Sequence, residues 1–152
     1  MATDFTSGYT FVQLVVELII EEVKEHSRMS KRITVRIGNI RADAELNDSQ
    51  TAEKIWKALP FEGKINTWGD EIYFSIPVKV GLENAKTVVS EGDLGYWPPG
   101  SAFCIFFGPT PMSQGDEIRP ASAVHVFGRI IGDPKIFKKV APGAKITIEK
   151  AE

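Results

Sequence analysis

The sequence contains very little cysteine and histidine. Cys104 is the single cysteine, so the chain cannot form an internal disulfide, and a reducing compartment is the simplest expectation. The two histidines, His26 and His125, are widely spaced from each other and from Cys104, which gives no metal-ligand pattern. The glycines form no phosphate-loop motif. We therefore predict neither a metal nor any other cofactor.

An excess of charge and a long apolar run are also missing. The net charge of −2 supplies no basic field that would attract nucleic acid. The longest apolar stretch near the N-terminus is interrupted by Glu17 and falls far short of the roughly 20 residues that span a bilayer. The first residues lack the positive segment of a signal peptide. We expect a cytoplasmic protein without a nucleic-acid or membrane partner.

The N-terminal part does contain a helical repeat of apolar residues. Over residues 10–26, Phe11, Val15, Ile19 and Val23 recur every four positions, which predicts a helix with a wide apolar face. We interpret residues 1–28 as a helical extension and residues 29–152 as the main domain. Two alternatives remain open. The helix packs on the main domain or on a second subunit, giving a homodimer, or it is an upstream extension and Met29 is the natural start.

The rest of the chain is rich in short alternating segments. Phe103–Phe107 is apolar on both faces, which predicts a doubly buried strand. A short helix capped by Asp48 or Ser49 is expected to end at Pro60, and Asp133-Pro134 is expected to open another. Further strands are expected over residues 33–37, 40–46, 72–80, 124–131 and 144–149. The predicted fold class is mainly β, a closed β-barrel with two short helices and an N-terminal helix.

Four fragments, in order, resemble the cyclophilin family over about residues 32–149. They are Thr51-Ala52-Glu53, Phe61-Glu62-Gly63, Gly100-Ser101-Ala102-Phe103 and Val126-Phe127-Gly128. The runs at 68–74, 96–100 and 106–111 are similar to the compact cyclophilin-like domains of bacteria and archaea, which are distantly similar to cyclophilins. The resemblance implies a cyclophilin-like barrel.

The resemblance also implies where a prolyl isomerase site would lie. Cyclophilins aim an arginine at the prolyl amide and hold the proline ring in an aromatic pocket. Counting from Phe61-x-Gly63, the arginine position falls on Trp68, which cannot donate to a prolyl nitrogen in that way. The other positions fall on Trp97 for a small wall residue, Ala102 for glutamine, Cys104 for phenylalanine and Val124 for histidine. The resemblance therefore leaves isomerase activity uncertain and assigns no catalytic residue.

Aromatic side chains that carry one polar atom suit proline-rich peptides or ring-shaped ligands. We take six residues as candidates for ligand binding: Trp68, Tyr73, Tyr96, Trp97, Cys104 and His125. Asp70 and Glu71 are interpreted as solvated loop carboxylates. The predicted function is a cyclophilin-like module that binds a peptide or a small molecule. The alternatives are a peptidyl-prolyl isomerase with a non-standard site and a structural protein that oligomerises through its N-terminal helix.

Overall fold

The computed structural model describes residues 10–29 and 31–151, and its contacts divide the chain into two units, Met1–Ser30 and Lys31–Glu152. In the first unit, helix α1 spans Phe11–Met29 and confirms the predicted helix, which ends three residues later than expected. Taken by itself, α1 exposes large apolar side chains, which are Phe11, Val12, Leu14, Val16, Leu18, Ile19 and Ile20. No helix within residues 10–29 or 31–151 is long and apolar enough to cross a membrane.

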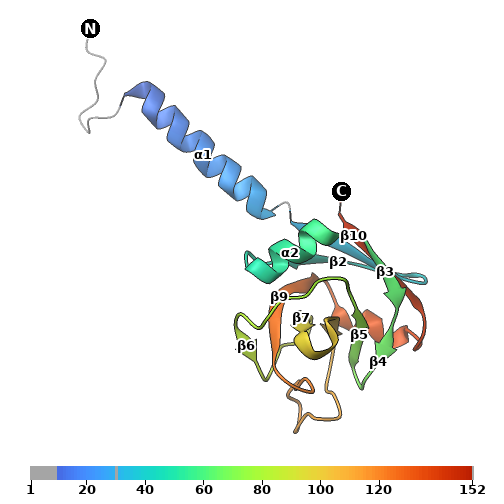
Figure 1. Cartoon of the computed structure of the whole chain (residues 1–152). Coiled ribbons are helices and arrows are strands. Elements are labelled where there is room, and N and C mark those ends of the chain that lie inside the picture. Colours follow the sequence, from blue (N-terminus) through green and yellow to red (C-terminus); the bar gives the residue numbers. More distant parts are fainter. Residues whose placement is uncertain (1–9, 30, 152) are drawn as a thin grey trace. The chain divides into compact units, whose positions relative to one another are not determined.

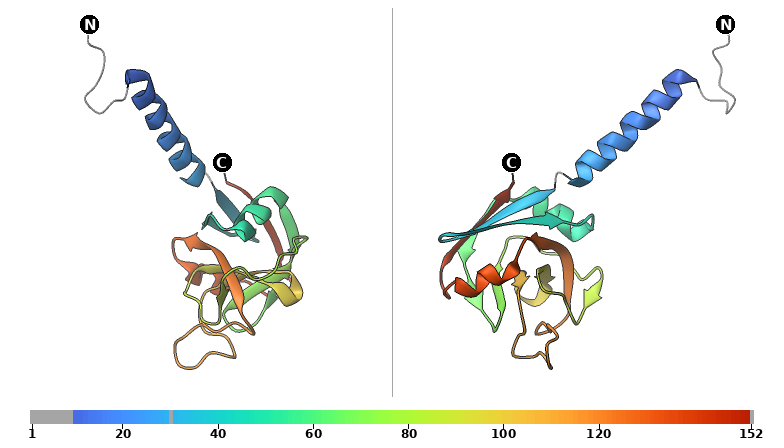
Figure 2. Two further views of the ribbon diagram at one scale, coloured as in Figure 1. Left: turned by 60° about the vertical axis from the view of Figure 1, so that its left-hand side comes forward. Right: turned by 180° about the vertical axis from the view of Figure 1, so that it is seen from behind.

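The second unit, which we call the sheet domain, is built around one strongly curved antiparallel sheet (Figures 1 and 2). Its strands in chain order are β1 (Arg32–Ile37), β2 (Ile40–Leu46), β3 (Phe61–Lys64), β4 (Asn66–Thr67), β5 (Glu71–Ser75), β6 (Ala85–Lys86), β7 (Asp93–Trp97), β8 (Ala102–Phe106), β9 (Val124–Ile131) and β10 (Lys145–Lys150). They pair in the order β3-β10-β1-β2-β9-β7-β8-β5-β4, and β6 pairs with β9.

Three short helical segments join these strands. Helix α2 (Gln50–Ala58) is capped by Ser49, whose hydroxyl accepts from the Ala52 amide at 3.1 Å, and it stops before Pro60 as predicted. The 3-10 helix η2 (Pro134–Lys139) is capped by Asp133 and has Pro134 as its first residue, also as predicted, and η1 (Pro98–Gly100) follows β7. The domain is therefore mainly β, and the end strands β3 and β4 do not pair with each other in the sheet formed by residues 31–151.

The alternation from Ile72 to Val80 predicted a longer strand than the chain forms. Strand β5 ends at Ser75, because Pro77 has no amide hydrogen to donate to a neighbouring strand. Ile76 and Val78 still point into the core, and the Tyr96 hydroxyl donates to the Val78 carbonyl at 2.6 Å. The segment thus follows the core without belonging to a strand.

The sheet packs apolar side chains on both of its faces. Its inner face holds the main core, which includes Phe74, Phe103 and Phe127. On the outer face a second cluster forms around Ala102, Cys104 and Phe106 of β8 and includes Val89, Ile118 and Val124. Strand β8 is therefore buried on both sides, as its sequence predicted. The outer cluster forms the floor on which the candidate site is built.

Candidate functional site

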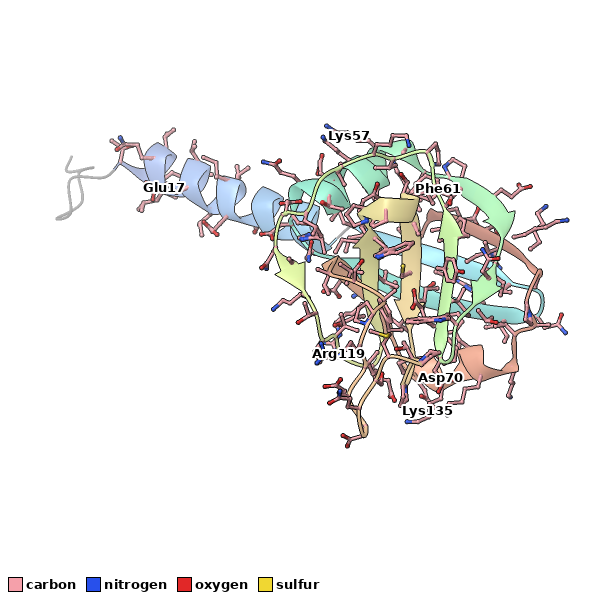
Figure 3. The ribbon with its side chains drawn as sticks, turned by 60° about the horizontal axis from the view of Figure 1, so that its bottom comes forward. Glu17, Lys57, Phe61, Asp70, Arg119 and Lys135 are labelled. Carbon is pink, nitrogen blue, oxygen red and sulfur yellow. The ribbon has the colours of Figure 1, made fainter. Side chains whose placement is uncertain are left out.

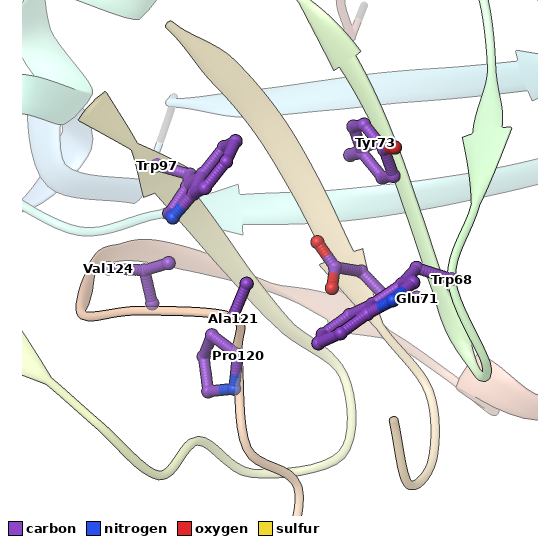
Figure 4. A pocket seen from close by; sticks show the side chains of 7 residues that line it. All are labelled: Trp68, Glu71, Tyr73, Trp97, Pro120, Ala121 and Val124. Carbon is purple, nitrogen blue, oxygen red and sulfur yellow. The ribbon is translucent and has the colours of Figure 1, made fainter. Parts of the chain in front are cut away.

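A pocket of about 220 Å³ opens beside this outer cluster (Figure 4). One wall comes from the β4–β5 hairpin, and the others come from the end of β7 and from the segment that leads into β9. The lining side chains are Trp68, Glu71, Tyr73, Trp97, Pro120, Ala121 and Val124. In Figure 4 the Glu71 carboxyl lies among the side chains of Trp68, Tyr73 and Trp97.

The β4–β5 turn places Trp68 and Glu71 side by side. Gly69 occupies the first central position of a two-residue hairpin loop. Its φ of +61° is a conformation that glycine adopts readily because it has no Cβ. The Trp68 amide donates to the Glu71 carbonyl at 2.9 Å, which closes the turn. The Asp70 amide donates to the Pro109 carbonyl at 3.0 Å and connects the turn to the loop after β8. Residues opposite each other at the end of a hairpin share a face, so both side chains reach the pocket.

Glu71 is buried, with 7% of its surface exposed, and this differs from our interpretation of it as a solvated loop carboxylate. Burial raises the pKa of its carboxyl to about 7, and hydrogen bonding with the Cys104 thiol opposes that shift only in part. None of the ion pairs formed within residues 31–151 involves Glu71. The pocket therefore contains a carboxyl that changes its charge near neutral pH.

Trp97 is fixed from two sides. Its indole nitrogen donates to the Ser122 hydroxyl at 2.7 Å. Its ring lies over Gly100, where an added Cβ would come within 3.0 Å of the ring. The Trp97 wall is thus held in place before any ligand arrives, which reduces the entropy cost of binding.

Three of the six candidate residues do not line the pocket. Tyr96 is fully buried on the inner face, where its hydroxyl bonds to Val78. Cys104 lies in the outer cluster below the pocket, and burial raises the pKa of its thiol well above the ordinary value. His125 is also buried, and its Nε2 lies 3.8 Å from the Glu83 Oε1. Trp68, Tyr73 and Trp97 are the candidates that the structure brings together.

The pocket coincides with the positions that the cyclophilin resemblance singles out. Trp68, Trp97 and Val124 line it, while Ala102 and Cys104 belong to the cluster below it. The sequence reasoning missed Glu71 and the Pro120-Ala121 segment. The Gly69-Asp70 turn was the available signal for Glu71, because a two-residue hairpin at that point pairs Glu71 with Trp68.

Metal binding has no support in the described part of the chain. Among the described side chains of residues 10–22 and 31–151, no group of three or more His, Cys, Asp or Glu could hold a metal ion. The pocket walls are aromatic or apolar apart from Glu71. Such a surface can enclose a small organic group and offer it one carboxyl partner.

Comparison with known proteins identifies the family. A family model described as Cyclophilin-like matches residues 31–149, which is most of the chain. The solution structure of a hypothetical protein from Archaeoglobus fulgidus is similar, with a TM-score of 0.69 and 43% sequence identity. That similarity covers 81% of this chain and 96% of the archaeal one. No curated protein matches the chain. The chain therefore belongs to the cyclophilin-like family.

Proposed function

We propose that the sheet domain is a binding module whose pocket holds a peptide side chain or a small molecule. One observation supports this most: three aromatic side chains, Trp68, Tyr73 and Trp97, converge on a single buried carboxyl. Ligand sites are mostly apolar and aromatic with a few polar groups that orient the ligand. The volume of about 220 Å³ lies below the ~300–1,000 Å³ of sites for drug-sized molecules, so the proposed occupant is one small group.

We propose binding without prolyl isomerisation. In the resemblance to cyclophilins, the arginine position falls on Trp68, whose indole lies in the pocket wall. The high barrier of the prolyl bond comes from the double-bond character of the amide, and an indole offers no charged donor to the prolyl nitrogen. Isomerase activity is the alternative that the experiment must separate from simple binding.

The test uses an Ala-Pro tetrapeptide and measures its cis–trans exchange by NMR. Unmodified protein, Trp68→Arg and Trp97→Ala are compared. We expect the peptide to shift the indole signals of Trp68 and Trp97 in the unmodified protein, and we expect the protein not to accelerate the cis–trans exchange. In Trp97→Ala the peptide should no longer shift the Trp68 signal. Accelerated exchange by the unmodified protein would establish catalysis and contradict the proposal. An unchanged Trp68 response in Trp97→Ala would show that this pocket is not the peptide site.

The fold around the pocket supports a further proposal, that the sheet domain is a closed barrel. The two ends of the strand order are β3 and β4, and only Ile65 separates them in the chain. One bent segment, residues 61–67, thus pairs with β10 through its first half and with β5 through its second. A barrel closed in this way leaves short edges only.

We also propose a second copy of this chain as the partner of α1. The helix by itself leaves Phe11, Leu18 and Ile19 exposed, with 68%, 65% and 52% of their surfaces accessible. An amphipathic helix needs a second apolar surface, and an identical helix offers one of matching length and pattern.

A further inference from the structure

We propose that the pocket recognises an alkylated ammonium group, with Glu71 as its counter-ion and Trp68, Tyr73 and Trp97 as its aromatic walls. This inference rests on the proposed binding function and names the class of ligand. It covers both a free quaternary amine and the side chain of an N-methylated lysine, because the two present the same cationic group.

Glu71 has no charged partner within residues 31–151. Buried charges in proteins are normally paired, because removing an isolated carboxylate from water is costly. The Oδ2 of Asp70, its neighbour in the chain, lies 3.8 Å from the Lys138 Nζ. The Oε2 of Glu117 lies 2.7 Å from the Arg119 Nε. Figure 3 shows Asp70 at the β4–β5 turn and Arg119 on the loop after β8. Lys138 and Arg119 thus already face other carboxylates, and Glu71 lines the pocket.

The walls of the pocket are also suited to a cation. An aromatic ring attracts a cation over its face, most strongly when the ring is tryptophan, and such attraction is greater in a site that excludes water. The pocket combines two tryptophans and one tyrosine with a carboxyl. A positive nitrogen interacts favourably with both the ring faces and the carboxyl. A neutral ring would lack the attraction to the carboxyl, and an anion would be repelled by it.

The lining of the pocket favours an alkylated ammonium group over the ammonium of an unmodified lysine or a guanidinium. An unmodified ammonium carries three donors and is strongly hydrated, so it needs several acceptors when it leaves water. Apart from Glu71 and the Tyr73 hydroxyl, the lining side chains offer no oxygen acceptor, and Pro120, Ala121 and Val124 are apolar. Methyl groups remove the donors and match these walls.

The experiment compares choline with 3,3-dimethylbutan-1-ol, which has the same shape without the charge. Each is titrated into the full chain at constant ionic strength, and the indole N–H signals of the three tryptophans are followed by NMR. Trp56 is an internal control, because it does not line the pocket and already lies 4.7 Å from the Lys150 ammonium. We expect choline to move the signals of Trp68 and Trp97 and to leave Trp56 unchanged.

The outcomes separate this inference from the proposed function. Equal shifts with choline and with the neutral alcohol would leave a binding pocket and overturn the cation inference. If choline, the neutral alcohol and the Ala-Pro tetrapeptide all leave the indole signals unchanged, both the cation inference and the proposed binding function would be overturned. Peptides carrying trimethyllysine or unmodified lysine then distinguish the sources, and we expect tighter binding of the trimethylated peptide. Tighter binding of unmodified lysine would contradict the preference for alkylated groups.

Two variants isolate the carboxyl. Glu71→Gln keeps the shape of the side chain, and we expect it to weaken choline binding at least about tenfold while binding of the neutral alcohol is kept. Asp70→Asn is the matched control, since its side chain faces Lys138, and we expect unchanged affinity. Equal affinities of Glu71→Gln and the unmodified protein would overturn the counter-ion role.

A pH series gives a second readout. The titratable groups that face Glu71 are the Tyr73 phenol on β5 and the Cys104 thiol on β8, and the lining residues of β7 and β9 are uncharged. Glu71 attracts a cation only when its carboxyl is ionised. Choline should therefore bind about tenfold more tightly at pH 8 than at pH 6. Glu71→Gln should remove this dependence, and a dependence that persists in the variant would contradict the assignment.

Discussion

At the scale of single residues, Glu71 should lower stability as the pH rises. Its folded pKa of about 7 lies above the ordinary 4.5, so the folded chain holds a proton that the unfolded chain releases. The stability that this proton contributes is fully present below pH 4.5 and is lost as the pH passes 7. The difference corresponds to roughly 3 kcal/mol at most.

Urea unfolding of the unmodified protein and Glu71→Gln at pH 5 and pH 8 measures this effect. The free energy of unfolding of the variant, relative to that of the unmodified protein, should rise between the two pH values. Asp70→Asn should keep the slope of the unmodified protein. Parallel pH dependences in the unmodified protein and Glu71→Gln would show that Glu71 is not held protonated by burial.

Gly128 is a second residue whose size matters. A Cβ at this position in β9 would lie 2.5 Å from the Glu45 carbonyl oxygen, a backbone atom of β2 that has little freedom to move. We expect Gly128→Ala to lower the free energy of unfolding by about 1–3 kcal/mol, measured in urea. Gly81→Ala is the control, because nothing lies within 4 Å of its Cβ position. Equal stability of the two variants would contradict this packing.

The sequence alone did not predict which of the candidate side chains face the pocket. Neighbouring residues of a strand point to opposite faces, so Trp97 lines the pocket while Tyr96 is in the core. The same alternation turns Val124 toward the pocket, and His125 does not line it. Residue type identified the aromatic candidates, but only the register of the sheet separates those that line the pocket from those that do not.

At the scale of elements, Glu83 holds the start of α2. Its Oε1 accepts from both the amide and the hydroxyl of Thr51 at 2.6 Å, and its Oε2 accepts from the Gln50 amide at 3.3 Å. These bonds satisfy amides at the helix N-terminus that have no partner within the helix. Hydrogen bonds from Thr51 lower the pKa of Glu83, so its stabilising effect is present above pH 4.5 and is lost as the pH falls.

We therefore expect Glu83→Gln to lower the thermal midpoint by a few degrees at pH 7 and by less at pH 4. Circular dichroism at the two pH values measures this. Glu91→Gln is the control, because Glu91 forms an exposed pair with Lys135 at 3.4 Å. A Glu83→Gln midpoint equal to that of the control at pH 7 would mean that the Glu83 contacts contribute little.

The apolar face of α1 leads to a prediction about assembly. If a second copy covers it, sedimentation velocity of the full chain should detect a dimer at tens of micromolar. Ile19→Glu places a charge on the exposed apolar face and should give a monomer, whereas Glu17→Gln on the polar side should not. A monomer of the unmodified chain, or a dimer that survives Ile19→Glu, would contradict the proposed pairing.

At the scale of the whole molecule, the sequence predicted the class of the fold and most of its elements. Alternating segments marked β1, β2 and β9, and Ser49 with Pro60 marked the ends of α2. The pairing order could not be read from periodicity, because β7 pairs not only with β8, the next strand of the chain, but also with β9, which lies much further along it. The pocket depends on that order, since it joins the β4–β5 hairpin to the end of β7 and the start of β9.

The central claim is that this pocket is the ligand site of the domain. Ligand-observed NMR tests it most directly, with a set of small cyclic, aromatic and ammonium compounds and three proteins: unmodified, Trp97→Ala and Trp56→Phe. Our account predicts that the compounds bound by the unmodified protein also bind Trp56→Phe and no longer bind Trp97→Ala. Compounds that bind Trp97→Ala as well as they bind the unmodified protein would place the ligand site elsewhere and contradict the account.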